Sequence, residues 1–99
     1  MDFLPIFVNI KNRNCLVVGG GEVAARKVVL LLRAGARVTV ISPELGTELS
    51  EQLHQGIIVH RAEVFHPDHL DDVVLVIAAT DDRSVNQQVS AAAGKLRIP

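Results

Sequence analysis

One stretch decides the fold of this chain: Cys15-Leu16-Val17-Val18-Gly19-Gly20-Gly21-Glu22-Val23-Ala24. A compact apolar strand runs directly into three glycines, and a helical pattern begins at Glu22. The segment fits the pattern G-x-G-x-x-A, in which each small residue has a purpose. The first glycine allows a tight exit from the strand, the second lets the main chain approach a pyrophosphate, and the alanine keeps the helix near the sheet. Because the free amides and the positive dipole end of a helix start favour anions, we predict a dinucleotide-binding turn.

Strands and helices are expected to alternate on the carboxyl side of this turn. The first helix should run from Glu22 to Ala34 and end at Gly35, with one face formed by Val23, Lys27, Leu30 and Ala34. The later elements are expected as a strand at 37–41, a helix at 45–55 ended by Gly56, a strand at 57–64, a helical turn or loop at 66–70, a strand at 73–79 and a helix from a Ser84 cap through Gly94. The strand at 73–79 is the most apolar and is expected to be central in the sheet.

This order of elements predicts a Rossmann-type doubly wound α/β fold. Helical crossovers force parallel pairing of the strands that they connect, and such crossovers are nearly always right-handed. Leu4 to Ile10 is a short extended stretch, and Leu96 to Pro99 has the pattern of the first residues of a further strand. We therefore expect residues 1–99 to form one partial NAD-binding Rossmann domain, truncated before or within its fifth strand.

Composition sets limits on the class of protein. Ninety-nine residues, 48% of them hydrophobic, suffice for one domain with a real core, and the 3% of aromatics leave that core to aliphatic side chains. A net charge of −1 argues against a nucleic-acid partner, and the apolar runs are too short for a membrane span. Met1 to Asn9 lacks the basic start of a signal peptide, and Cys15 is the single cysteine, most simply a small core residue. These features favour a cytoplasmic location.

The ribose-binding acid of the dinucleotide fingerprint is missing from its usual place. It is expected about 20 residues after the glycines, at the end of the second strand, where this chain has Ser42. Glu44 lies two residues later and could reach a ribose hydroxyl, or the loop main chain at Pro43 could do so. Glu44 could equally be the acidic first turn of the next helix. No arginine follows directly in the loop to hold a 2′-phosphate, so the choice between NAD and NADP stays open on this motif.

Polar residues after the fourth strand lie where open α/β sheets bind ligands. We expect Thr80 or its main chain to line the cofactor site, and Asp81 and Asp82 to start the last helix. His66 and His69 are three residues apart and could share a metal, but the four histidines have no cysteine partner at metal-ligand spacing, so solvated surface histidines are the simpler interpretation. No metal site and no nucleophile–base–acid triad is predicted.

The longer pattern resembles the amino-terminal domain of the siroheme synthase family, which contains precorrin-2 dehydrogenases and sirohydrochlorin ferrochelatases. The resemblance covers essentially the whole chain, and the glycine motif is only part of it. It is carried by Leu4-Pro5-Ile6-Phe7, the segment 15–24 followed by Arg26-Lys27 and Leu30-Leu31-Leu32, then Gly35-Ala36-Arg37-Val38-Thr39-Val40, Ala78-Ala79-Thr80-Asp81-Asp82 and Val85-Asn86.

The resemblance implies an enzyme of siroheme biosynthesis. Members of the family pass a hydride from precorrin-2 to NAD, which gives sirohydrochlorin, and then insert ferrous iron; they form homodimers. By position, Glu22 and Val23 are expected to contact NAD at the helix start, and Pro43 and Glu44 at the exit of the second strand. With the residues derived above, the expected cofactor contacts are Gly19, Gly21, Glu22, Val23, Ser42, Pro43, Glu44 and Thr80.

No catalytic residue is expected within this chain, since the aspartate that the family uses falls in the stretch after Pro99. The dimer-forming segment and, in fused enzymes, a methyltransferase domain are also expected there. We therefore expect this chain to bind cofactor and to catalyse poorly or not at all. Two other interpretations stay open: a regulatory nucleotide-sensing Rossmann module, and a structural domain whose glycine turn binds nothing.

Overall fold

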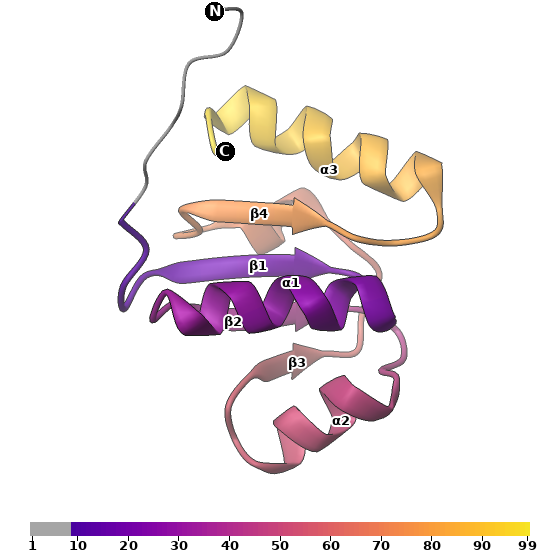
Figure 1. Ribbon diagram of the computed structural model, residues 1–99. Coiled ribbons are helices and arrows are strands. Elements are labelled where there is room, and N and C mark those ends of the chain that lie inside the picture. Colours follow the sequence, from indigo (N-terminus) through magenta and orange to yellow (C-terminus); the bar gives the residue numbers. More distant parts are fainter. Residues whose placement is uncertain (1–8) are drawn as a thin grey trace, which may run out of the picture.

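Four parallel strands form the sheet of this chain, in the order β3-β2-β1-β4 (Figure 1). We describe residues 9–99 of a computed structural model; the expected extended stretch from Leu4 therefore lies mostly outside the described residues. The strands are β1 (Asn14–Val18), β2 (Arg37–Ile41), β3 (Val59–Arg61) and β4 (Leu75–Ala78). The helices are α1 (Glu22–Arg33), α2 (Thr47–His54), the short 3-10 helix η1 (Pro67–Leu70) and α3 (Arg83–Leu96). The predicted doubly wound α/β fold is confirmed.

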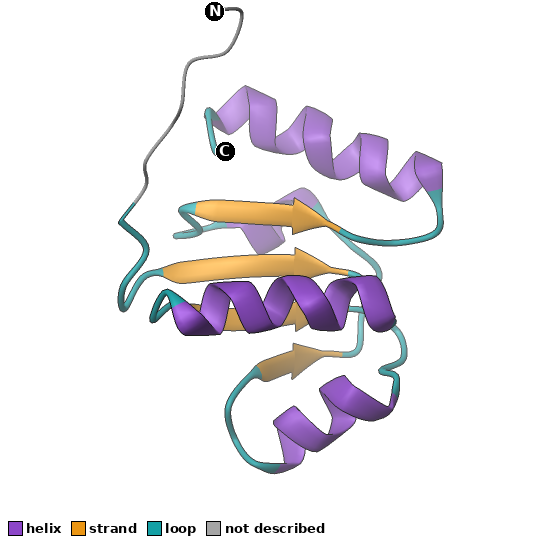
Figure 2. Cartoon of the chain, viewed as in Figure 1, coloured by secondary structure: helices purple, strands orange, loops and turns teal. Residues whose placement is uncertain are grey.

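Strand β1 lies at the centre because its side chains alternate between two buried layers. Cys15 and Val17 pack into a cluster with α1 and α2, whereas Leu16 and Val18 pack into a second cluster with η1 and α3. A strand whose successive residues face opposite sides, and are apolar on both, can be stable only between two helical layers. Figure 2 shows helices in front of and behind the strands in this arrangement. As expected, Cys15 is a core residue, and burial raises the pKa of its thiol.

The face of α1 that is buried is not the one formed by Val23, Lys27, Leu30 and Ala34. Ala24, Ala25, Val28 and Leu31 face the core, while Leu30 is 57% exposed. Because residues 28–32 are all apolar, periodicity alone could not select the inner face. The glycine turn selects it, since it fixes the angle at which the helix leaves β1 and places Ala24, fully buried, against the sheet.

Strand β4 is at the edge of the described sheet, which corrects the prediction that residues 73–79 are central. Its register with β1 pairs Cys15 with Leu75 and Val18 with Ala78. On its other side, the Val76 amide donates to the Pro99 carbonyl at 3.0 Å. Leu96, expected to begin a strand, instead belongs to α3, because the helix continues until Arg97 adopts the left-handed conformation.

The helix ends follow the sequence signals with one correction. Gly35 and Gly56 both have positive φ, at 82° and 74°, and they follow α1 and α2 as predicted. The N-cap of α3 is Asp82 and not Ser84, because the Asp82 carboxylate accepts from the amides of Ser84 and Val85 at 2.9 and 3.3 Å. Strand β3 is shorter than the predicted 57–64, since the chain leaves the sheet after Arg61. No helix in residues 9–99 is long and apolar enough to cross a membrane.

Candidate functional site

A cavity of about 540 Å³ opens at the carboxyl ends of β1, β2 and β4. In open α/β sheets, ligands bind at this edge of the sheet, where the crossovers diverge to either side. The cavity is lined by three segments that are distant in sequence: the glycine turn with the start of α1, the exit of β2 with the stretch after β3, and the exit of β4 with the start of α3. The lining residues are Val18, Gly19, Gly20, Gly21, Glu22, Val23, Arg26, Ile41, Ser42, Pro43, Glu63, Val64, Phe65, Ala79, Thr80, Asp81, Asp82 and Val85.

The surroundings of the three glycines differ, so a side chain would have a different effect at each position. Gly19 has φ 135°, and any side chain there would meet the Ala79 carbonyl carbon at 2.8 Å. A side chain at Gly20 would overlap the Glu44 carbonyl and the Ser42 hydroxyl. Gly21 has an ordinary φ of −96°, and a β-carbon there would have no atom of the described residues within 4 Å. The first two glycines are therefore required by the chain itself, whereas the space around Gly21, which lines the cavity, is open.

The start of α1 carries main-chain donors with no side-chain cap. Gly21 is the N-cap, and no side chain of the described residues caps the first turn of the helix. A helix start has main-chain N–H groups without intrahelical partners, and together with the dipole they favour an anion. The open space at Gly21 and these donors fit the pyrophosphate of a dinucleotide, which needs close approach of the main chain.

The exit loop of β2, residues 42–46, forms one wall of the cavity. Ser42 and Pro43 line it, but Glu44 does not. The Glu44 side chain is exposed, and its carbonyl accepts from the Ser42 hydroxyl. The loop is joined to the glycine turn by a hydrogen bond from the Gly46 amide to the Gly20 carbonyl at 2.7 Å. Of the eight residues predicted to contact the cofactor, only Glu44 is thus placed outside the cavity lining.

Asn86 holds the exit of β4 in place. The sequence pattern did not indicate this role. The Asn86 amide group accepts from the Thr80 amide at 3.2 Å and donates to the Thr80 carbonyl at 3.0 Å. Thr80, predicted for the site, is therefore fixed at the cavity edge by the first turns of α3. An asparagine six residues after Thr80 is a weak signal in the sequence, since it acts only once the helix has folded back.

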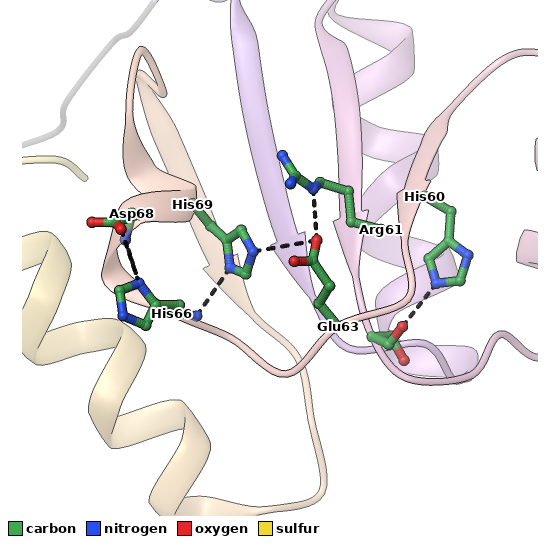
Figure 3. A network of polar contacts seen from close by, with 7 residues as sticks. His60, Arg61, Glu63, His66, Asp68 and His69 are labelled. Atoms are coloured by element: carbon green, nitrogen blue, oxygen red, sulfur yellow. Dashed lines mark hydrogen bonds and ion pairs between the residues drawn. The ribbon is translucent and has the colours of Figure 1, made fainter.

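A polar network links the end of β3 to η1 (Figure 3). The Arg61 side chain donates to the Glu63 carboxylate at 2.7 Å, and this hydrogen bond lowers the pKa of Glu63. His69 lies 3.6 Å from the same carboxylate, and its Nδ1 accepts from the His66 amide at 2.9 Å. His66 is a surface residue as predicted, but the His69 side chain is only 8% exposed. The prediction for His69 was wrong because η1 turns its ring toward Glu63.

Several lining residues were missed from the sequence. Gly20 is the free position of the G-x-G motif, and only the approach of Ser42 and Glu44 makes it necessary. Arg26 lies one helical turn after Glu22, and Glu63 and Phe65 follow β3. The rule that parallel strands end at one edge could have placed the last two, given the strand order. Among residues 9–99, no group of three or more His, Cys, Asp or Glu side chains is positioned to hold a metal ion.

Fold and cavity together define a Rossmann-type nucleotide-binding domain. The chain belongs to the family described as "Putative NAD(P)-binding", whose model matches residues 6–99. It is 62% identical over 103 residues to a siroheme synthase of Nitrosospira multiformis and 61% identical over 100 residues to one of Nitrosomonas europaea; each alignment covers all of this chain. The resemblance to the amino-terminal region of siroheme synthases is thereby confirmed.

A solved structure supports the same relationship. The structure of SirC, a precorrin-2 dehydrogenase, superposes with a TM-score of 0.81 and 31% sequence identity, over 89% of this chain and 44% of that chain. The chain spans about a fifth of the length of the curated relatives, 22% and 21% for the two siroheme synthases.

Proposed function

We propose that this chain is the NAD-binding part of a precorrin-2 dehydrogenase that also inserts ferrous iron during siroheme biosynthesis. The observation that carries the proposal is the open space at Gly21, beside uncapped main-chain donors of α1, in the cavity at the carboxyl edge of the sheet. The names of the siroheme synthases and of SirC supply the substrate class, a reduced tetrapyrrole. When bound, NAD would supply the hydride acceptor for the oxidation of precorrin-2 to sirohydrochlorin, and the accompanying proton would be released to solvent.

Within this proposal, the residues of the chain bind and orient the dinucleotide. The amides of Gly21, Glu22 and Val23 would hold the pyrophosphate, and Ser42 and Pro43 would line the site of the adenosine half. Thr80, held by Asn86, would form the opposite wall of the site. We assign no catalytic acid or base among these residues, so the chain alone, as a partial domain, would bind cofactor and oxidise precorrin-2 poorly or not at all.

The charge of the cavity supports NAD as the cofactor over NADP. Its lining carries four acidic residues, Glu22, Glu63, Asp81 and Asp82, against one basic residue, Arg26. The β2 exit loop, residues 42–46, contains no lysine or arginine. A 2′-phosphate bound at this loop would therefore add negative charge where the loop itself offers no matching cation.

Titration of the purified chain with NAD and NADP by calorimetry tests the cofactor proposal. We expect saturable binding of NAD, weaker binding of NADP, and a loss of NAD affinity by at least about tenfold in Gly21→Asp, since a carboxylate would face the pyrophosphate. Gly94→Asp is the matched control, because Gly94 lies in α3 away from the cavity and has no atom within 4 Å of an added β-carbon. Equal affinity of both variants and the unchanged chain would contradict a site at the glycine turn.

A second experiment distinguishes the enzyme from a regulatory nucleotide-sensing module. A chain extended past Pro99 is incubated with precorrin-2 and NAD, and NADH formation is followed by absorbance. The proposal expects NADH and sirohydrochlorin in equal amounts, with activity abolished by Gly21→Asp. Tight NAD binding by that longer chain without any tetrapyrrole binding or oxidation would favour the sensing module.

A further inference from the structure

We propose that Ser42 is a positioning residue, which with Gly20 and His60 fixes loop 42–46 as a wall of the nucleotide cavity. It stands where the dinucleotide fingerprint has a ribose-binding acid, but its hydroxyl donates within the loop. The inference rests on the proposed function, because the position of this wall matters to affinity only if a nucleotide occupies the cavity.

The Ser42 hydroxyl is already engaged within the chain. Ser42 is 8% exposed, and its Oγ donates to the Glu44 carbonyl. Its main-chain amide donates to the Arg61 carbonyl at 3.2 Å. A hydroxyl has one hydrogen to donate, so the donor of Ser42 closes the loop on itself and is not free for a ribose oxygen.

The closed loop can pack directly on Gly20 because this residue has no side chain. The Gly46 amide donates to the Gly20 carbonyl at 2.7 Å, and a methyl group on Gly20 would overlap both the Ser42 hydroxyl and the Glu44 carbonyl. The loop therefore packs directly on the main chain of the turn that is proposed to hold the pyrophosphate. A shift of the loop would move the adenosine wall relative to the pyrophosphate site.

His60 holds the other side of Ser42 from the neighbouring strand. Its Nε2 lies 2.8 Å from the Ser42 carbonyl, a contact drawn as the dashed line from His60 in Figure 3. Since a carbonyl can only accept, the ring contributes an Nε2–H donor. His60 pairs in register with Val40 on β2 and is not part of the cavity lining, so it does not contact a nucleotide there directly.

This arrangement accounts for the missing acid. A carboxylate at position 42 has no hydrogen to donate, and it would face the Glu44 carbonyl as a second acceptor beside Gly20. Opposed acceptors without a donor are unfavourable where water is excluded. Ser42→Asp is therefore expected to open the loop and weaken NAD binding, although it restores the residue type of the fingerprint.

Ser42→Thr and Ser42→Val form a matched pair for testing the hydroxyl. The two side chains have the same shape and differ in the hydroxyl alone, so the difference between them excludes any effect of the added methyl. We expect Ser42→Val to bind NAD and ADP-ribose about fivefold more weakly than Ser42→Thr, the size of one lost hydrogen bond. Binding of inorganic pyrophosphate should be equal in both, since the glycine turn remains intact.

A double-mutant cycle with His60 separates positioning from direct contact. His60→Leu should weaken ADP-ribose binding to a similar extent, and His60→Gln, which keeps an N–H donor, should restore it. The Ser42→Val and His60→Leu effects should not add, because both release the same loop. Additive effects of the two substitutions would instead indicate that the Ser42 hydroxyl and His60 act independently, and would contradict a shared role in fixing the loop.

Hydrogen exchange of the Gly46 amide gives a measurement that needs no ligand. We expect this amide to exchange at least about fivefold faster in Ser42→Val than in Ser42→Thr, with the amides of β1 unchanged. Equal exchange and equal ADP-ribose affinity in the pair would overturn the inference, as would tighter NAD binding by Ser42→Asp. If the unchanged chain binds neither NAD nor ADP-ribose, the proposed function fails, and the exchange comparison still decides whether Ser42 fixes the loop.

Discussion

Thr80 and Asn86 are joined by reciprocal hydrogen bonds across the exit of β4: the Asn86 side chain accepts from the Thr80 amide at 3.2 Å and donates to the Thr80 carbonyl at 3.0 Å. The Thr80 hydroxyl adds a contact to the same Asn86 oxygen at 2.8 Å. One amide side chain thereby satisfies both main-chain groups of a residue that no longer belongs to the sheet. The geometry of the cavity edge at Thr80 thus depends on the start of α3.

Asn86→Asp should destabilise the chain, because the carboxylate keeps the acceptor for the Thr80 amide but loses the donor for the Thr80 carbonyl. We expect a loss of about 1 kcal/mol in the free energy of unfolding, the low end of the range for a polar group left without its partner, because Thr80 and Asn86 are half-buried. Urea denaturation at pH 7 measures it. Gln87→Glu is the control, since Gln87 is the next residue along α3, is exposed and undergoes the same change of amide to acid. An equal loss of unfolding free energy in both variants would refute a specific role for Asn86.

Leu31 and Leu30 are neighbours in α1 with opposite environments, so they test which face of the helix is buried. Leu31 is 5% exposed and Leu30 is 57% exposed. Leu31→Ala should lower the free energy of unfolding by about 2–5 kcal/mol, because it leaves a cavity in the core. Leu30→Ala should change it by less than about 0.5 kcal/mol. Thermal unfolding followed by circular dichroism compares the two, and similar losses would mean that the helix is rotated from the position described.

Two glycines with open surroundings should respond in opposite directions to alanine. Gly94 lies inside α3, where alanine is favoured, so Gly94→Ala should stabilise the chain by about 0.5–1 kcal/mol. Gly56 has φ 74°, so Gly56→Ala should destabilise it by about 1–2 kcal/mol, the penalty for a side chain in the left-handed region. Neither added methyl meets an atom within 4 Å, which leaves the backbone conformation as the cause. The denaturant midpoint of Gly94→Ala should lie above that of the unchanged chain, and the midpoint of Gly56→Ala should lie below it.

Asp82 should contribute to the acid sensitivity of the fold. The hydrogen bond from the Ser84 side chain, with those from the Val85 and Ser84 amides, lowers the pKa of Asp82 below its ordinary value of 3.8. A carboxyl with a lowered folded pKa stabilises fully above its unfolded pKa, and that contribution is lost as the pH falls through the folded value. Asp82→Asn keeps a capping side chain but does not titrate.

The stability difference between the unchanged chain and Asp82→Asn should therefore be constant above about pH 5 and shrink below 3.8. Urea midpoints measured in steps from pH 7 to pH 2 follow it. A difference that stays the same over this interval would show that the Asp82 cap does not depend on its charge.

The elements near the glycine turn were the most predictable from the sequence. The transition from Val18 to Gly19 and then to the helix at Glu22 predicts strand, turn and helix at once, because each of the three needs a different residue type. Gly35 and Gly56 end their helices for a local reason, their positive φ, which no other residue adopts as easily. These signals act over a few residues and are therefore visible before folding.

What the sequence alone determined is the alternation of strands and helices, the parallel α/β class and the presence of a dinucleotide-type turn, since all three follow from local periodicity and the conformational freedom of glycine. The tertiary structure decided which face of α1 is buried, that β4 lies at the edge of the described sheet, and that Ser42 faces Gly20 while Asn86 holds Thr80. Those choices depend on contacts between segments far apart in the chain. Their free energy arises only when the strands have assembled, and no window of local sequence contains it.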